Sequence, residues 1–171
     1  MNFDLVQHRA DSVQLGVEFR ARLEPKPNKL ILTYTLRGFL QNLILPRPDK
    51  SLERLDNLWQ NTCFEAFFKL KDSPKYIELN LSPFSAYNAY IFTDYRLAML
   101  DYELPQPVFS SEKDKDFYSF IAKIENLDLE QFSALSITAI IKLKSGETTH
   151  WAIKHASEKP DFHLSNSFIK L

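Results

Sequence analysis

Polar side chains suited to ligand binding occupy alternate positions in two neighbouring segments of the chain. Residues 63–70 and 76–82 have the composition of β-strands, in which successive side chains point to opposite faces. One face of the second segment carries an aromatic ring, a carboxylate, an amide and a hydroxyl, contributed by Tyr76, Glu78, Asn80 and Ser82. Glu65 extends this polar set in the first segment. Such a face can bind a polyhydroxylated ligand, and the alternative is an ordinary solvated outer face of a sheet.

Two carboxylates on this face suggest a second kind of chemistry. Glu65 and Glu78 can lie on adjacent strands, as in glycoside hydrolases that set an acid beside a nucleophile or a base. The usual catalytic signatures are absent, including a phosphate-binding glycine loop, a glycine-flanked nucleophilic serine and a His-Glu-x-x-His zinc helix. We therefore predict no catalytic residue, and a glycoside-active enzyme using Glu65 and Glu78 is the alternative.

Several aromatic side chains could form the apolar part of a binding site. Aromatic rings stack on the C–H faces of sugars, while amides, carboxylates and arginines bind the hydroxyl groups. Natural contacts of this kind are Trp59, Tyr87, Tyr90, Trp151 and Arg96. The alternative for each ring is a place in the hydrophobic core, which the alternation around Trp151 favours.

Histidines and methionines provide little support for a metal or a cofactor. His150, His155 and His163 fall within fourteen positions, but their spacing matches no compact set of metal ligands. We therefore predict no metal site and no cofactor. Haem is the exception kept open, because Met99 and a histidine could serve as its axial ligands.

The pattern along the rest of the chain predicts mainly β-structure. Residues 13–23 and 29–37 alternate apolar and polar side chains, as expected for an antiparallel pair, whereas residues 38–57 read as a long loop. After residues 86–92 we expect a turn and a strand through Met99. Glycine in residues 144–147 predicts a compact hairpin. The whole chain, residues 1–171, is predicted to be a single all-β domain with about nine or ten strands, an antiparallel two-sheet sandwich or a barrel.

Composition limits the classes of partner and the compartment. The 171 residues include 44% hydrophobic residues, and 21 Lys and Arg nearly balance 22 Asp and Glu. A domain that holds phosphate backbones normally has a basic surplus, so we do not expect nucleic acid as a partner. Residues 1–9 lack the features of a secretory signal, no later stretch suits a membrane span, and Cys63 is the single cysteine. We therefore predict a cytoplasmic location.

Ordered blocks between residues 54 and 163 carry a family resemblance. The blocks are residues 54–68, 76–83, 90–96 and 151–163, with Trp59 and the Ser-Pro turn at Pro83 among them. Together they resemble bacterial DOMON-like proteins, which are grouped with the type 9 carbohydrate-binding modules. The chain departs from the pattern at Gln60, where Glu is expected, and at Tyr87, where many relatives carry tryptophan. The resemblance implies an antiparallel two-sheet β-sandwich, of the jelly-roll or immunoglobulin-like kind, that binds a sugar, or haem in other branches, without catalysis.

The resulting hypothesis is a non-catalytic domain that binds a small carbohydrate or a similar polar ligand. Trp59 and Tyr87 are expected to stack on the ring, and Glu78, Asn80 and Arg96 to bind hydroxyl groups. The remaining predicted site residues are Glu65 and Tyr90 on the strands, Trp151, and the loop histidines His155 and His163. A third hypothesis is an interaction module whose aromatic side chains pack against a second copy of the chain, as a homodimer.

Overall fold

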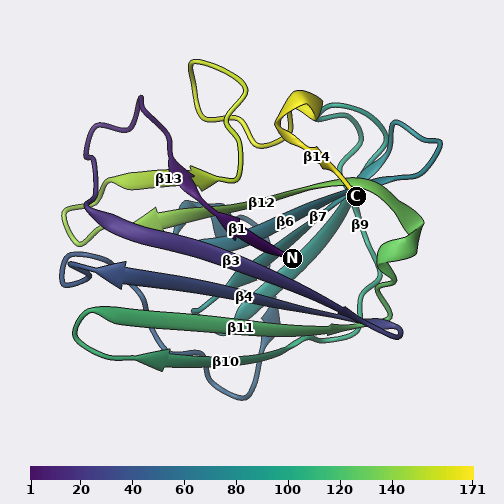
Figure 1. Cartoon of the computed structure of the whole chain (residues 1–171). Coiled ribbons are helices and arrows are strands. Elements are labelled where there is room, and N and C mark those ends of the chain that lie inside the picture. The colour runs from purple at the N-terminus through teal and green to yellow at the C-terminus, as the bar shows by residue number, and fades with distance from the viewer.

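Two β-sheets face each other across a hydrophobic core in the computed structural model, which describes residues 1–171 (Figure 1). All neighbouring strands of the first sheet are antiparallel. In spatial order they are β1 (Asn2–Asp4), β3 (Val17–Lys26), β4 (Lys29–Gly38), β11 (Phe117–Glu125) and β10 (Val108–Lys113).

The second sheet has nine strands and supplies the candidate site. Its main path, in spatial order, is β2 (Val6–Gln7), β13 (Thr148–Ala152), β12 (Phe132–Lys142), β6 (Cys63–Leu70), β7 (Tyr76–Ser82), β8 (Ala86–Phe92) and β5 (Glu53–Arg54). Two further strands join it, β14 (Ile169–Lys170) beside β12 and β9 (Leu100–Asp101) beside β8. The pair β5–β8 is parallel and every other pair is antiparallel.

Helical structure is limited to three short 3-10 turns. These are η1 (Leu58–Gln60), η2 (Leu129–Gln131) and η3 (Ser165–Ser167). None of the helices has the length and apolar character required to cross a membrane.

The predicted fold class, an all-β antiparallel sandwich of two sheets, is confirmed. The structure has fourteen strands, of which nine are five residues or longer. The additional strands are two or three residues long and pair at sheet edges, where a pattern of alternating side chains is too short to recognise. The antiparallel pair expected from residues 13–23 and 29–37 is present as β3 and β4, although β3 begins at Val17 and not at Val13. The hairpin around residues 144–147 is also present.

The strand expected through Met99 is wrong. Residues 93–99 form a tight loop closed by a bridge between Asp94 and Leu97, and only Leu100–Asp101 is extended. Arg96 and Ala98 have φ angles of 49° and 50°, in the left-handed region, which a β-strand cannot accommodate.

The core between the sheets contains the apolar faces of β6 and β7, as the alternation predicts. Phe64 lies at its centre, with its ring stacked on Tyr34 at 4.7 Å and on Phe120 at 4.8 Å between centroids. The other inward side chains of these two strands are Ala66, Phe68, Ile77, Leu79 and Leu81. Because β4 and β11 supply the facing rings, Phe64 links the two sheets.

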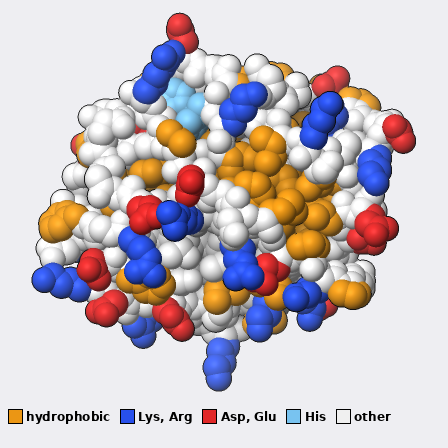
Figure 2. Space-filling model, viewed as in Figure 1, with side chains coloured by type: hydrophobic (Ala, Val, Ile, Leu, Met, Phe, Trp, Pro, Cys, Tyr) orange, Lys and Arg blue, Asp and Glu red, His pale blue; other side chains and the backbone are white.

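Outside the core, charges of both signs cover the face seen in Figure 1. Figure 2 shows Lys and Arg side chains intermixed with Asp and Glu on this face, and hydrophobic atoms gathered near the two chain ends. Arg20 pairs with Asp4 and Arg22 with Glu24 on the exposed side of the five-stranded sheet. On this face, pairing of opposite charges agrees with the balanced composition.

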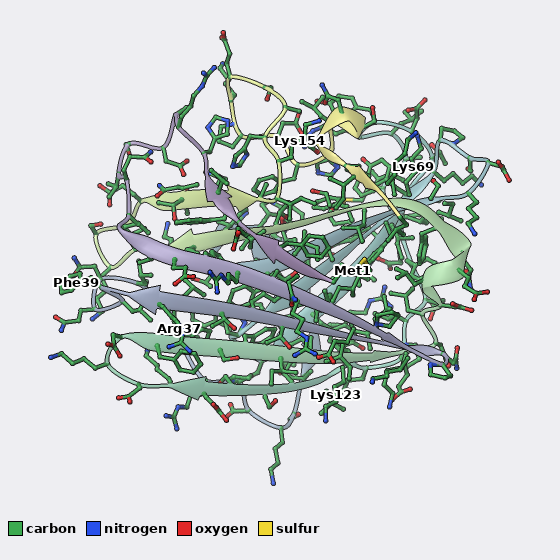
Figure 3. The ribbon with its side chains drawn as sticks, viewed as in Figure 1. Met1, Arg37, Phe39, Lys69, Lys123 and Lys154 are labelled. Carbon is green, nitrogen blue, oxygen red and sulfur yellow. The ribbon has the colours of Figure 1, made fainter.

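Replacing Phe64 with alanine should test this core. We expect Phe64→Ala to lower the free energy of unfolding by about 3–5 kcal/mol, because a fully buried ring leaves a cavity. Phe39→Ala is the matched control, since Phe39 is 62% exposed and points away from the sandwich in Figure 3. Urea denaturation of both variants measures the difference, and an equal effect at the two positions would contradict the assignment of Phe64 to the core.

Candidate functional site

The outer face of β6, β7 and β8 is covered, although it carries polar side chains. Glu65, Glu78 and Asn80 are 2%, 5% and 0% exposed. A second hydrophobic cluster lies among them on this side of the sheet, formed by Phe67, Tyr76, Tyr90, Phe92, Ile140, Ala152 and Phe162. The simple alternative of a solvated outer face is therefore wrong, because the central strands are buried on both sides.

Loops from distant parts of the chain provide the cover. Figure 1 shows the segment between β13 and β14, residues 153–168, arching over one end of the nine-stranded sheet. It meets the loop of residues 93–99 through Asp161, whose carboxylate accepts a hydrogen bond from Tyr95 Oη at 2.6 Å. Arg96 Nη2 lies 3.1 Å from the other oxygen of the same carboxylate. These contacts hold two loops together above the sheet.

A pocket of about 380 Å³ remains between these loops and the sheet. Its volume lies within the range of roughly 300–1,000 Å³ that is common for small-molecule sites. The lining residues are Trp59, Glu65, Phe67, Glu78, Phe92, Arg96, Met99, Ile140, His150, Pro160, Asp161, Phe162 and His163. The pocket therefore combines aromatic walls with a few polar groups, which is the usual composition of a ligand site.

Glu65 and Glu78 form the acidic part of the pocket. Glu65 lies opposite Asn80, and Phe67 lies opposite Glu78, so the two carboxylates are diagonal neighbours on one face. Thr138 Oγ1 donates to Glu65 Oε2 at 3.1 Å, and Asn80 Nδ2 donates to Glu78 Oε1 at 2.8 Å. The second oxygen of each carboxylate receives no hydrogen bond from the chain, which leaves it available to a ligand in the pocket.

Burial shifts the protonation of these groups. Desolvation raises the pKa of Glu78 to about 7, against the lowering effect of the Asn80 hydrogen bond. Desolvation, followed by repulsion from Glu78, raises the pKa of Glu65 well above its ordinary value. His163 Nε2 lies 3.7 Å from Glu78 Oε2, but burial and then the charge of Arg96 lower the pKa of His163 to about 4. His163 is therefore neutral near pH 7 and does not compensate the carboxylates.

Backbone conformation positions Arg96 at the rim. Its φ of 49° directs its N–H towards Tyr76 Oη at 3.2 Å, and the same hydroxyl lies 2.8 Å from His163 Nδ1. A non-glycine residue in the left-handed region costs about 1 kcal/mol or more, so surrounding contacts must hold it there. Its guanidinium is the only Lys or Arg group lining the pocket and is paired with Asp161.

Trp59 forms part of the aromatic wall. It lies in η1 and packs edge-on against Tyr90, with 6.3 Å between the ring centroids. Tyr90 Oη in turn donates to Asp56 at 2.7 Å, which fixes the entry to this turn. Trp59 is half-buried, so part of its ring faces the pocket.

Half of the sequence-predicted site converges on this pocket. Trp59, Glu65, Glu78, Arg96 and His163 all line it, although they come from five separate segments. Their role in binding stays a prediction. Two more predicted residues contact the lining without belonging to it. Asn80 donates a hydrogen bond to Glu78, and Tyr90 packs against Trp59.

Three predicted residues lie elsewhere, which corrects the sequence-based site. Tyr87 is opposite Leu81 and therefore shares the inward side of β8, away from Glu78. Trp151 belongs to the main core, 5.4 Å from the ring of Phe19, because its neighbour Ala152 takes the outward position. His155 lies outside the pocket, with Nε2 2.7 Å from the carbonyl oxygen of Val6.

Sequence reasoning missed part of the lining for two different reasons. Phe67 and Phe92 share the face of Glu65 and Tyr90, so the same alternation could have identified them. Pro160, Asp161 and Phe162 come from a loop without periodicity, and only the resemblance block around residues 151–163 marked that loop.

A larger hollow of about 580 Å³ lies on the outer side of the five-stranded sheet. Only two of its ten lining residues are hydrophobic, and its charged side chains include the pairs Arg20–Asp4 and Arg22–Glu24. It lacks an apolar wall and free buried polar groups. The pocket over β6 and β7 is therefore the better candidate site.

Comparison with solved structures supports the fold assignment. A candidate carbohydrate-binding protein from Bacteroides uniformis aligns with a TM-score of 0.60 and 13% identity, covering 98% of this chain and 83% of that one. A family 9 carbohydrate-binding module from Caldicellulosiruptor kristjanssonii, solved with glucose, aligns with a TM-score of 0.51 and 10% identity, covering 98% and 82%. The similarity shows a shared fold. No protein-family model and no curated protein matches the sequence.

The raised pKa of Glu78 makes stability depend on pH. Below its ordinary pKa of 4.5 the carboxyl is neutral in both folded and unfolded chains. As the pH rises from 4.5 to about 7 only the unfolded chain loses the proton, so the free energy of unfolding falls over this window and levels off above it. We expect Glu78 to reduce the free energy of unfolding by about 3 kcal/mol between pH 4.5 and pH 8. Glu78→Gln should remove that loss, whereas Glu112→Gln on exposed β10 should keep it. Urea denaturation at both pH values measures it, and identical pH profiles for all three proteins would contradict the burial argument.

Proposed function

We propose that the chain is a non-catalytic carbohydrate-binding domain of the DOMON-like kind, related to type 9 carbohydrate-binding modules. The observation that carries the proposal is the pocket in which the ring of Trp59 and the free oxygens of Glu65 and Glu78 converge. A sugar offers C–H faces to the ring and hydroxyl donors to the carboxylate oxygens. The fold shared with two proteins described as carbohydrate-binding adds support.

Positions of the other polar groups suggest how a sugar would lie. Arg96 and Asp161 stand on the loop side of the pocket, opposite the carboxylates on the sheet. A ring bound against Trp59 could therefore receive hydrogen bonds from Arg96 and donate them to Glu65 or Glu78. Met99 and Phe162 would exclude water from the remaining edge. Each side chain is held by contacts within the chain, so little reorganisation would be needed on binding.

An enzyme using Glu65 and Glu78 is the second candidate, because both carboxyls line the same pocket. Glycoside hydrolysis generally needs one carboxyl protonated and the other ionised at the working pH. Here burial raises the pKa of both groups in the same direction. A raised pKa in both groups does not assign an acid and a base to the pair. Turnover of chromogenic glycosides that disappears in both Glu→Gln variants would favour the enzyme instead.

Haem binding stays a prediction. Met99 and His163 both line the pocket, as axial ligation would require, but His163 Nδ1 already contacts Tyr76 Oη and Met99 is about half exposed. A haemin titration monitored at the Soret band tests it, with Met99→Ala as the variant that should lose the band.

The homodimer hypothesis has less support in the fold. Tyr87, Tyr90 and Trp151 are already buried within one chain, so they are not free to pack against a second copy. Trp59 alone among the predicted rings keeps an accessible face, and that face belongs to the pocket.

Substituting Trp59 tests the proposed function. We expect Trp59→Ala to weaken sugar binding at least about tenfold, because a stacking ring contributes on the order of 1 kcal/mol beyond the area that it buries. Isothermal titration calorimetry with glucose, cellobiose and other mono- and disaccharides at millimolar concentration provides the measurement. Tyr87→Phe is the control outside the pocket and should bind as the unmodified chain does. Absence of heat with every sugar in the panel would count decisively against carbohydrate binding.

A further inference from the structure

Charge in the pocket is not balanced. Three carboxyl groups line it, those of Glu65, Glu78 and Asp161, against a single guanidinium. Arg96 forms its ion pair with Asp161, at 3.1 Å, and His150 pairs with Asp11, at 2.8 Å. No lysine or arginine lies within ion-pairing distance of Glu65 or Glu78.

Leaving two carboxylates buried without a cation is costly in a folded protein. Buried charges are normally paired, or else they become neutral through a shift of their pKa. Glu65 is 2% exposed, and its Oε1 accepts no hydrogen bond within the chain although the residue lines the pocket. The same is true of Glu78 Oε2, which lies 3.7 Å from Nε2 of the neutral His163. The chain thus presents two acceptors in a partly dry site, and the one guanidinium in the pocket forms its ion pair with Asp161 and not with either glutamate.

A cation delivered by the ligand would complete this arrangement. An ammonium group placed beside both free oxygens would gain charge-assisted hydrogen bonds in a low-dielectric site. The aromatic walls of Trp59, Phe67 and Phe92 would also attract a cation through the faces of their rings. A neutral sugar offers only hydroxyl donors, which favour the ionised form of the two carboxyl groups less strongly than an ammonium does.

We propose that the pocket selects a sugar bearing a protonated amino group, with the ammonium bound between Glu65 and Glu78. This assignment rests on the proposed function, because Trp59 and the Arg96–Asp161 pair would bind the remainder of the sugar. An alkyl ammonium ion lacks hydroxyls for those groups and should bind more weakly than an amino sugar.

Matched pairs of sugars test the assignment by calorimetry on the full chain at pH 7.5. The pairs are glucosamine with glucose, and the β-1,4-linked glucosamine disaccharide with cellobiose, and N-acetylglucosamine serves as the uncharged amide. We expect the amino sugar of at least one pair to bind about tenfold or more tightly than its neutral partner and than the amide. Equal binding within the pairs would overturn the amino-sugar assignment and leave carbohydrate binding standing. Absence of binding by all five sugars would overturn the proposed function itself.

Charge-removing variants locate the effect. Glu65→Gln and Glu78→Gln keep the shape of the side chain, and the quantity measured is the ratio of affinities for the amino and the neutral sugar. We expect that ratio to fall to within about threefold of one in each variant, while Glu112→Gln on the exposed strand β10 keeps the ratio of the unmodified chain. A ratio unchanged in both pocket variants would overturn the placement of the ammonium.

Dependence on pH gives a second measurement that needs no variant. Titratable and charged groups face Glu78 from every element packed against it: Cys63 and Glu65 from β6, Tyr76 from β7, Tyr90 from β8, Arg96 from the 93–99 loop, and Asp161 and His163 from the 153–168 loop. Glu78 must lose its proton to pair with an ammonium, and its pKa is about 7. Lowering the pH from 7.5 to 5.5 should therefore weaken amino-sugar binding about fifteenfold, because loss of the Glu78 charge outweighs the fuller protonation of an amine with a pKa of roughly 7.7. Near pH 7, binding should release protons. Affinity for the amino sugar that stays constant over this range would contradict the proposal.

Discussion

Period-two alternation along β6 and β7 is the constraint on which both the core and the pocket depend. One set of side chains, with Phe64 at its centre, packs against the five-stranded sheet. The other set, which includes Glu65 and Glu78, faces a second layer made of loops. Because the two sets are interleaved along the same strands, a register shift of one residue would place carboxylates in the core and rings in the pocket. The packing of the core therefore also fixes the geometry of the site.

The loops that cover the polar face change how its carboxyl groups titrate and hydrogen-bond. An exposed glutamate on a strand would titrate normally and hydrogen-bond to water. Under the loops, Glu65 and Glu78 lose that water, and Thr138 and Asn80 replace it at only one oxygen of each carboxylate. One oxygen of each carboxylate therefore lacks a hydrogen-bond donor. A ligand that supplies donors to these two oxygens is favoured over one that leaves them unpaired. Burial of the two carboxyl groups also lowers stability at neutral pH, as is common for preorganised binding sites.

Asp161 connects the parts of the chain that make the cover. Its carboxylate contacts Tyr95 and Arg96 in one loop and the backbone N–H of His163 in its own loop. His163 continues the network to Tyr76 on the sheet. Loop residues separated by more than sixty positions in sequence thus form a continuous hydrogen-bonded rim, which explains how the left-handed conformation of Arg96 is maintained.

Sequence patterns determined the elements and their faces. Alternation in residues 63–70 and 76–82 was sufficient to assign Phe64, Ala66 and Phe68 to the core and Glu65 and Glu78 to the opposite side, because strand geometry is local. The family resemblance added the fold class and drew attention to Trp59 and the 151–163 loop. Short edge strands such as β5 and β9 lay beyond this reasoning, since two residues contain no period.

Only the tertiary structure decided which candidates meet. The register of β13 places Trp151 in the core, and the register of β8 turns Tyr87 to the inward side of its strand. His155 contacts Val6 near the N-terminus. Whether a polar strand face is exposed or covered depends on loops far away in sequence, so the burial of Glu78 and the lining by Asp161 and Phe162 could not be predicted from local pattern. Side-chain direction is set by neighbouring residues in the chain, whereas desolvation is set by whatever the fold places above them.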